Sequence, residues 1–369
     1  MWRLRAQPRN ATGDQNNNRE DTLSDQMRSS WLALATFALF STSAFAQQDV
    51  PAKTLPVPTG DVSPQLQKII GMPLRNGWNV LPKTGEEWKP IADAGAEPTI
   101  KALPGLLERM KVKVEKSTID GVRVFNVTPE KTAPGNENRV LIHMHGGCYV
   151  LNPREAALPE AVLIAGFGGF KVISVDYRMP PEAYFPAALD DGMTVYKSVL
   201  KTTDAKRIGI IGTSAGGALV LEMGLRAKAL NLPMFGAISS GTPMSDVTKV
   251  GDTFYTNEMV DNVLVSRDGF CDAGVKVYAA GHDLKDPLIS PVYGDYANFA
   301  PTILTSGTRD LLLSNTVRVH RKLRDAGIEA FLQVFEGQSH AQYQRDDSAP
   351  ETKAAFTEIA GFFNKHLEK

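Results

Sequence analysis

A glycine-rich turn around Ser214 holds the residues of this sequence that are best suited to nucleophilic chemistry. It reads Gly212-Thr213-Ser214-Ala215-Gly216-Gly217, after an apolar run at 208–211 typical of a strand and before helical apolar spacing at 218–230. A serine on such a G-x-S-x-G turn presents its hydroxyl at a helix N-terminus, where free N–H groups and the helix dipole stabilise an anion. The pattern predicts a nucleophilic serine, and a purely structural glycine turn is the alternative interpretation.

A serine hydroxyl needs a general base, and the base needs an acid that orients it. In a sheet of this kind the acid and then the histidine follow the serine along the chain, each after a strand. Asp310 follows the apolar run 302–305, and His340 follows the apolar run 331–335. We therefore predict a catalytic triad of Ser214, Asp310 and His340. The alternatives are a helix-capping role for Asp310 and an ordinary loop position for His340.

A second glycine-containing loop can supply the hydrogen-bond donors that this chemistry needs. His145-Gly146-Gly147-Cys148-Tyr149 follows a predicted strand at 139–144. Glycines let the main chain approach a substrate oxygen closely, and backbone N–H groups can then bind the oxyanion of a tetrahedral intermediate. We predict the oxyanion hole in this loop, while a generic glycine turn explains the glycines but not their coincidence with the other motifs.

These motifs lie between strands and helices that alternate along the chain. The apolar runs predict eight strands, at 112–117, 122–127, 139–144, 172–176, 207–211, 235–239, 302–305 and 331–335. Helical apolar spacing predicts helices at 158–165, 188–200, 218–230, 316–326 and 354–367. The fold class is α/β, with a mostly parallel sheet of about eight strands that is covered by helices on both faces. The first two strands form an antiparallel pair around an Asp120-Gly121 turn.

Two regions interrupt or precede this alternation. About sixty residues separate the strand near 240 from the strand at 302, far more than the few residues of a usual connection. We predict an inserted helical cap at about 243–290, over the carboxyl edge of the sheet. Residues 51–104 are rich in proline and have weak periodicity, which indicates short helices joined by turns.

The N-terminus has the pattern of an export signal. A polar stretch at 1–26 precedes Met27-Arg28, an apolar run at 31–40 and the small-x-small end Ala44-Phe45-Ala46. This predicts a signal peptide within residues 1–46, cleaved after Ala46, and a periplasmic or secreted protein. The run is shorter than the roughly 20 residues of a membrane span. Residues 1–26 do not resemble the start of a signal peptide, so we expect translation to begin at Met27.

Composition and cysteine content narrow the choice of partners. The chain is 43% hydrophobic and 22% charged, with a formal net charge of −1 and no basic tract, which argues against nucleic acid as a partner. The spacing of the two cysteines, Cys148 and Cys271, matches no metal site, and we expect neither a metal nor a cofactor. One disulfide is conceivable, but Cys148 lies in the predicted oxyanion loop, so two free thiols are the favoured interpretation.

From about residue 139 to its end, the sequence resembles the bacterial hormone-sensitive-lipase-like (family IV) esterases of the α/β-hydrolase superfamily. The resemblance is carried by loop 145–148, by the turn 212–217, by the segment 301–311 and by His340. Asp176-Tyr177-Arg178, Pro181-Glu182 and Phe185-Pro186-Ala187-Ala188 complete it. Together these motifs are highly specific. Thr213, where the commoner residue is Asp, is similar to the GTSAG subgroup.

The resemblance implies roles for particular residues. The oxyanion donors would be the N–H groups of Gly147, Cys148 and Ala215, with Gly146 in the same loop. Residues 47–110 would form an N-terminal part of the cap, and residues 111–369 would form the catalytic domain. The sequence departs from the family pattern at Cys148, which replaces the third glycine of HGGG, and at Ala341-Gln342-Tyr343, where the family commonly has Gly and Phe after the histidine.

The function that these observations predict is two-step hydrolysis of small, short-acyl carboxylic esters through an acyl-enzyme. A serine peptidase or amidase of the same fold is one alternative, although residues 51–110 are too few for the large extra domain of such peptidases. A non-catalytic ligand-binding homologue is another, but this chain retains all three triad residues. The sequence allows a homodimer without indicating one.

Overall fold

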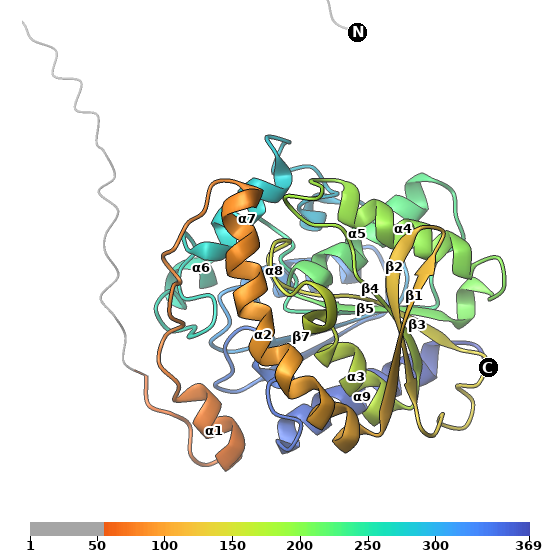
Figure 1. Cartoon of the computed structure of the whole chain (residues 1–369), viewed down its shortest axis with the longest axis horizontal. Coiled ribbons are helices and arrows are strands. Elements are labelled where there is room, and N and C mark those ends of the chain that lie inside the picture. The colour runs from red at the N-terminus through yellow and green to blue at the C-terminus, as the bar shows by residue number, and fades with distance from the viewer. Residues whose placement is uncertain (1–54) are drawn as a thin grey trace, which may run out of the picture. The chain divides into compact units, whose positions relative to one another are not determined.

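The computed structural model describes residues 55–369, and the predicted signal peptide at residues 1–46 lies outside them. In the described part, eight strands form one sheet in the order β1-β2-β4-β3-β5-β6-β7-β8 (Figure 1). The strands are β1 (Val112–Ile119), β2 (Val122–Pro129), β3 (Val140–Met144), β4 (Lys171–Val175), β5 (Ile208–Thr213), β6 (Ala237–Gly241), β7 (Thr302–Gly307) and β8 (Ala330–Phe335). The predicted eight-stranded sheet is confirmed.

One strand, β2, runs opposite to the other seven strands of the described sheet. Strand β2 pairs antiparallel with both β1 and β4, whereas every pair from β4 to β8 is parallel. The turn between β1 and β2 contains Asp120 and Gly121, whose φ angles of 45° and 87° fit the hairpin turn that this dipeptide predicts. Because the remaining strands are parallel, their carboxyl ends meet at one edge, and that edge carries the predicted chemistry.

Helices cover both faces of the sheet. Neighbouring strand residues point to opposite faces, so Ile211 packs in the cluster of α3 and α9 while Ile210 packs in the cluster of α4, α5 and α8. The bounds are α3 (Pro159–Gly168), α4 (Ala187–Val199), α5 (Ala215–Ala229), α8 (Leu313–Asp325) and α9 (Pro350–His366). All five predicted helices are present, which confirms the layered α/β arrangement.

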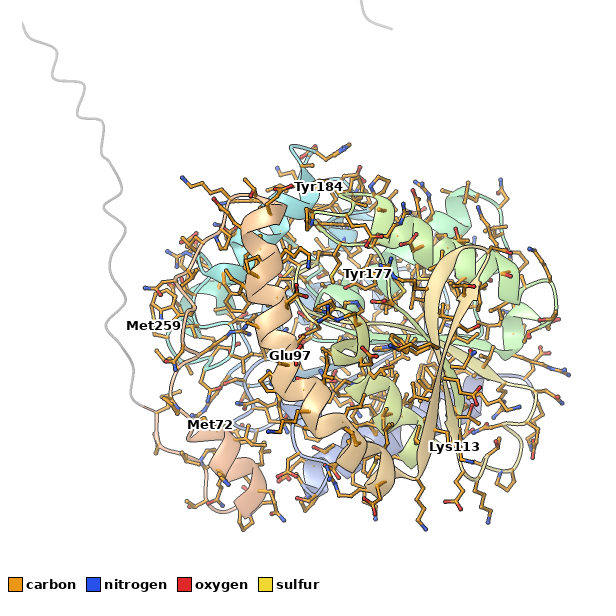
Figure 2. The ribbon with its side chains drawn as sticks, in the orientation of Figure 1. Met72, Glu97, Lys113, Tyr177, Tyr184 and Met259 are labelled. Atoms are coloured by element: carbon orange, nitrogen blue, oxygen red, sulfur yellow. A yellow bond between two sulfur atoms is a disulfide. The ribbon has the colours of Figure 1, made fainter. Side chains whose placement is uncertain are left out.

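The proline-rich N-terminal region differs from the prediction. After the short α1 (Pro64–Ile70), one helix of 26 residues, α2 (Gly85–Met110), runs through three internal prolines and contacts both α3 and α7 (Figure 1). The three prolines are exposed, so the carbonyls that they leave unpaired can bind water. The buried face of α2 contains Trp88, Ala92, Ala96 and Leu103, and the exposed Glu97 lies outside it (Figure 2). Burial of this stripe outweighs the cost of the prolines, so the prediction of short helices was wrong here.

The long interval between β6 and β7 contains two helices, α6 (Thr253–Thr256) and α7 (Phe270–Ala279). Helix α7 packs against the loop that follows β3, because Gly274 has no side chain there. A Cβ at Gly274 would lie 2.7 Å from Cγ2 of Val150 and 3.1 Å from the carbonyl oxygen of Cys148. No helix among residues 55–369 is long and apolar enough to cross a membrane.

Candidate active site

Ser214 occupies a strained turn between β5 and α5. Its φ of 64° and ψ of −121° lie in a region that side chains other than glycine rarely adopt. The neighbouring glycines make the turn sterically feasible, because a Cβ at Gly216 would lie 1.9 Å from the carbonyl oxygen of Met144 and one at Gly212 would lie 2.5 Å from the same atom. The turn has the geometry that the sequence predicted, and the Ser214 side chain stands at the N-terminus of α5.

Asp310 and His340 meet at the same edge of the sheet. Asp310 follows β7 and is fully buried, and its Oδ1 lies 3.1 Å from Nδ1 of His340, which follows β8. Oδ1 also accepts the N–H of Leu312, and Oδ2 accepts the hydroxyl of Ser306 at 2.7 Å. Helix α8 has Leu312 at its N-cap without a side-chain cap bond, so Asp310 faces the imidazole and is not the N-cap of this helix.

A hydrogen bond connects the serine turn to the histidine loop. The Tyr343 hydroxyl, three residues after His340, lies against Oγ1 of Thr213, the residue before Ser214. Thr213 donates its own hydroxyl proton to Oε1 of the buried Glu160 at 2.5 Å. A catalytic triad also uses a hydrogen bond from the serine to the histidine. Within residues 55–369, Ser214 and His340 are not hydrogen-bonded to each other. The structure therefore places the three residues on neighbouring loops and pairs two of them.

The loop after β3 lies directly against the serine. A Cβ at Gly146 would lie 3.1 Å from Cβ of Ser214, and the chain then passes through φ angles of 128° at Gly147 and 54° at Cys148. Within residues 55–369, several N–H groups at this point have no hydrogen-bond acceptor, namely those of Gly146, Gly147, Cys148 and Ala215. Unused donors beside a nucleophile are what an oxyanion hole requires.

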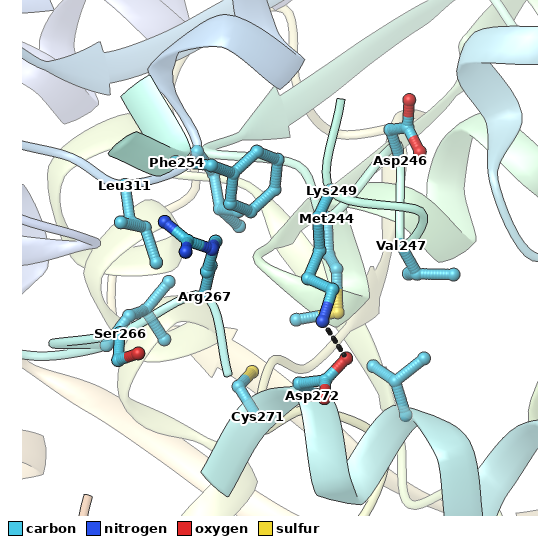
Figure 3. A pocket seen from close by; sticks show the side chains of 13 residues that line it. Met244, Asp246, Val247, Lys249, Phe254, Ser266, Arg267, Cys271, Asp272 and Leu311 are labelled. Atoms are coloured by element: carbon cyan, nitrogen blue, oxygen red, sulfur yellow. Dashed lines mark ion pairs between the residues drawn. The ribbon is translucent and has the colours of Figure 1, made fainter. Parts of the chain in front are cut away.

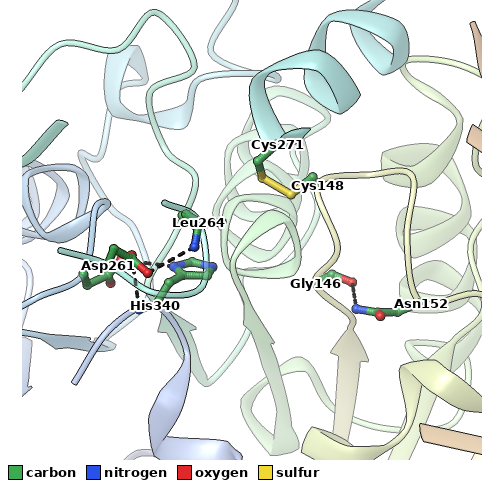
Figure 4. Close-up of a disulfide and its surroundings, with 8 residues drawn as sticks. Gly146, Cys148, Asn152, Asp261, Leu264, Cys271 and His340 are labelled. Carbon is green, nitrogen blue, oxygen red and sulfur yellow. Dashed lines mark hydrogen bonds and ion pairs between the residues drawn. A yellow bond between two sulfur atoms is a disulfide. The ribbon is translucent and has the colours of Figure 1, made fainter. Parts of the chain in front are cut away.

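His145 and Tyr177 hold this loop in place through a ring stack and a hydrogen bond. Their rings stack at 4.0 Å, and the Tyr177 hydroxyl donates to the carbonyl oxygen of His145 at 2.8 Å. On the other side, the amide of Asn152 donates to the carbonyl oxygen of Gly146 at 3.0 Å (Figure 4). Burial lowers the pKa of His145 to about 3, so this imidazole is neutral at ordinary pH and does not act as a second base.

Cys148 and Cys271 form a disulfide, so the prediction of two free thiols was wrong (Figure 4). Their Cα atoms are 5.3 Å apart although the two residues are 123 positions apart in the sequence. The bridge forms because α7 packs closely on loop 148–150, which the sequence spacing of the cysteines does not reveal. Cys148 therefore contributes no free thiol beside Ser214, and its side chain connects loop 146–148 to the inserted segment.

A small cavity adjoins these loops (Figure 3). Its volume is about 30 Å³, and apolar side chains such as Met244, Phe254 and Leu311 line much of it. Met244 donates its N–H to the carbonyl oxygen of Ser214 at 3.1 Å, and Leu311 directly follows Asp310. Lys249, also in the lining, pairs with Asp272 at 3.4 Å. In the described part of the chain, no group of three or more His, Cys, Asp or Glu side chains could hold a metal ion.

Asp261, in the inserted segment, is the main functional candidate that sequence reasoning missed. It is fully buried, and its Oδ2 accepts the N–H groups of Leu311 and His340 at 2.8 Å and 3.3 Å. It belongs to no recognised motif, and an aspartate among other acidic residues of an insertion gives no sequence signal. Only the folded chain brings it beside the Asp310–His340 pair.

Comparison with known proteins agrees with this geometry. The sequence pattern of one known family, described as having the alpha/beta hydrolase fold, matches residues 141–344. The chain belongs to this α/β-hydrolase family. It is 42% identical to esterase E25, whose crystal structure superposes with a TM-score of 0.83 over 86% of this chain and 98% of that one. A crystal structure of an esterase from the bacterial hormone-sensitive lipase family is 27% identical, with a TM-score of 0.66 over 70% and 85% of the two chains.

The relatives known by sequence are named as an esterase and an acetyl-hydrolase. An esterase of Acinetobacter venetianus is 27% identical over 254 residues, which are 68% of this chain and 82% of that protein. An acetyl-hydrolase of Streptomyces hygroscopicus is 26% identical over 246 residues, covering 66% and 81%. The chain is therefore a hormone-sensitive-lipase-like α/β-hydrolase, as the resemblance implied.

Proposed function

We propose that this protein is a serine carboxylesterase that hydrolyses short-chain carboxylic esters through an acyl-enzyme intermediate. Relatives named acetyl-hydrolase, esterase and carboxylesterase support this proposal. The observation that carries the proposal is the Asp310–His340 pair, which lies beside the Ser214 turn and the unused N–H groups of loop 146–148.

The reaction assigns one task to each group. His340 takes the proton of Ser214 as the serine oxygen attacks the ester carbonyl, and Asp310 orients the imidazole and stabilises its charged form. The N–H groups of Gly147, Cys148 and Ala215 stabilise the oxyanion of the tetrahedral intermediate. His340 then gives its proton to the leaving alcohol. In the second step a water molecule attacks the acyl-enzyme while His340 takes its proton, and His340 returns a proton to Ser214 as the acid is released.

The small cavity supports a preference for short acyl groups. With a volume of about 30 Å³ and lining residues adjacent to Ser214 and Asp310, it can hold a few heavy atoms and no extended chain. We therefore place the acyl group in this cavity. A series of nitrophenyl esters of increasing acyl length tests the assignment, with kcat/KM expected to be highest for acetate to butyrate. A maximum at long acyl chains would contradict it.

Replacement of the nucleophile tests the function itself. Ser214→Ala should lower kcat for nitrophenyl acetate by about 10⁴-fold or more, because the attacking oxygen is lost. Ser348→Ala, which removes an exposed hydroxyl that donates to Asp346 in the loop before α9, serves as the matched control and should retain activity. Full esterase activity of Ser214→Ala would refute the proposal. Peptide and anilide substrates assayed in parallel distinguish an amidase, and labelling by a fluorophosphonate probe distinguishes a non-catalytic homologue.

We also propose that the mature protein is exported to the periplasm or secreted, beginning near Gln47. The Cys148–Cys271 disulfide supports this proposal, because structural disulfides form in oxidising compartments. N-terminal sequencing of the exported protein tests it, and a mature start far from residue 47 would contradict the predicted cleavage. The homodimer stays a prediction, for which light scattering of the purified protein is the direct test.

A further inference from the structure

Asp261 connects the loops that carry the acid and the base. One oxygen, Oδ1, accepts the N–H groups of Val263 and Leu264 at 2.8 Å and 3.1 Å and so fixes the loop of Asp261 itself. The other oxygen, Oδ2, accepts the N–H of Leu311 at 2.8 Å and that of His340 at 3.3 Å. Figure 4 shows Asp261 beside Leu264 and His340. Four backbone donors therefore depend on one buried carboxylate.

The two donors at Oδ2 belong to different loops of the active site. Leu311 directly follows Asp310 in the loop after β7, and the second N–H is that of His340 itself, after β8. Hydrogen bonds from backbone N–H groups to an ionised carboxylate are stronger than those between neutral groups. Asp261 does not compete for the imidazole, since Nδ1 of His340 is already paired with Asp310. Its contacts fix where the acid and the base stand relative to each other.

The next residue extends the connection to the N-terminal region. The amide of Asn262 donates to the carbonyl oxygens of Ile69, Ile70 and Met72, at the end of α1. Its Oδ1 accepts the amide of Gln342 at 2.7 Å, two residues after His340. The dipeptide 261–262 therefore joins the inserted segment, the N-terminal region and both catalytic loops.

The charges around Asp261 make it sensitive to pH. Asp310 and His340 lie beside it, and the Arg345 guanidinium is the further cation that interacts with it. Burial, together with the charge of Asp310, raises the pKa of Asp261 to about 6, and His340 opposes this rise. Above this pH the carboxylate is ionised and can accept all four N–H groups, whereas protonation weakens its contacts with them.

We propose that Asp261 is a positioning residue of the esterase reaction, which holds the loops of Asp310 and His340 in register through its hydrogen bonds to Leu311 and His340. The proposal rests on the serine esterase function proposed above. Asparagine at this position keeps the shape of the side chain but has a single acceptor oxygen and no charge, so two of the four N–H groups lose their partner. Misplacement of catalytic groups by a fraction of an ångström to 1 Å costs up to about 10²-fold in rate.

The experiment compares Asp261→Asn with wild type and with Asp252→Asn, which makes the same chemical change at an exposed position of the same segment. Hydrolysis of nitrophenyl acetate is measured against pH, and kcat is expressed per active site titrated with a fluorophosphonate, so that unfolded molecules are not counted. For Asp261→Asn we expect kcat to fall by about 10- to 100-fold with KM within about threefold of wild type. Asp252→Asn should match wild type.

The pH profile separates positioning from a general loss of structure. In wild type, protonation of Asp261, whose pKa burial and the Asp310 charge raise to about 6, weakens the loop contacts as the pH falls. Asparagine does not titrate, so the acid limb of kcat/KM should move to lower pH. A kcat within twofold of wild type, or a lowered kcat with an unmoved acid limb, would overturn the proposal. If Asp261→Asn yields no folded protein, Asp261→Glu is measured instead. It keeps the charge, so we expect the wild-type acid limb with kcat lowered about tenfold, and an unchanged kcat would overturn the proposal.

Failure of the esterase function itself gives a different result. In that case wild type does not hydrolyse the esters, or Ser214→Ala hydrolyses them as well as wild type does. Both results are obtained without any Asp261 variant, so they are distinguishable from a failure of the positioning role.

Discussion

The disulfide between Cys148 and Cys271 should stabilise both the fold and the oxyanion loop. It closes a loop between residues 123 positions apart. The loss of loop-closure entropy in the unfolded chain then corresponds to about 5 kcal/mol of stability at 25 °C on the chain-entropy model. Unfolding entropies of about 2.1 cal/mol/K per residue give roughly 0.7 kcal/mol/K for a mature chain that begins near Gln47, so reduction should lower Tm by about 7 °C.

The catalytic effect follows from the position of Cys148. Its N–H is a proposed oxyanion donor, and its side chain is held by α7 through Cys271. Loss of a complete donor costs about 10²- to 10³-fold in kcat. Reduction leaves the donor present but less well fixed, because Asn152 and Tyr177 still hold the loop. We therefore expect a decrease of roughly tenfold in kcat.

The assay combines calorimetry and ester hydrolysis, with and without a reductant, on wild type and on a Cys148→Ala/Cys271→Ala double variant. The double variant should resemble the reduced wild type in Tm and kcat and should not respond to the reductant. Thiol titration of the denatured protein verifies that reduction is complete. If fully reduced wild type keeps the Tm and kcat of the oxidised protein, the reasoning about the disulfide is refuted.

Three further changes test the surroundings of the site. Tyr343→Phe removes a buried hydroxyl behind the nucleophile and should lower the free energy of unfolding by about 1–2 kcal/mol in a denaturant titration, whereas the exposed Tyr255→Phe should have no effect. Because burial lowers the pKa of His145 to about 3, the unfolded chain binds more protons here between pH 3 and about 6.5. The free energy of unfolding should therefore fall by about 1.4 kcal/mol per unit of pH decrease in that range, and His145→Asn should abolish this contribution. Gly274→Ala places a Cβ 2.7 Å from Val150, so α7 should dock poorly and titratable thiols should appear; a fully oxidised variant would contradict this close packing.

The sequence predicts the parts of the structure that follow from local pattern. Strand and helix periodicity gives the eight strands and five sheet-covering helices, and the rule that loops at carboxyl strand ends carry chemistry brings Asp310 and His340 to one edge. The predictions that were wrong concern interactions between segments that lie far apart in the sequence. The three prolines argue against a long α2, but the burial of Trp88 and of the residues one and two turns later overrides them. The disulfide and the contacts of Asp261 depend on how the inserted segment packs, which no local pattern contains.

One departure from the family pattern meets the subgroup residue Thr213 in the folded chain. Thr213 precedes Ser214 where Asp is commoner, and Tyr343 belongs to the segment after His340 where the family commonly has Gly and Phe. Their hydroxyls contact each other, and Thr213 also donates to the buried carboxylate of Glu160, which lies 3.1 Å from Nε2 of His143.

An aspartate at position 213 would place a second carboxylate against that of Glu160, which is unfavourable in a buried site. Threonine avoids this repulsion and still offers a donor to Glu160 and an acceptor to Tyr343. The tyrosine hydroxyl then lies close to the backbone of β6, where a Cβ at Gly241 would be 1.9 Å from it, so this position requires glycine. Thr213 of the subgroup motif therefore contacts Tyr343 of the loop that carries His340. We expect substitutions at positions 213, 241 and 343 to be tolerated better when they are made together than when each is made alone.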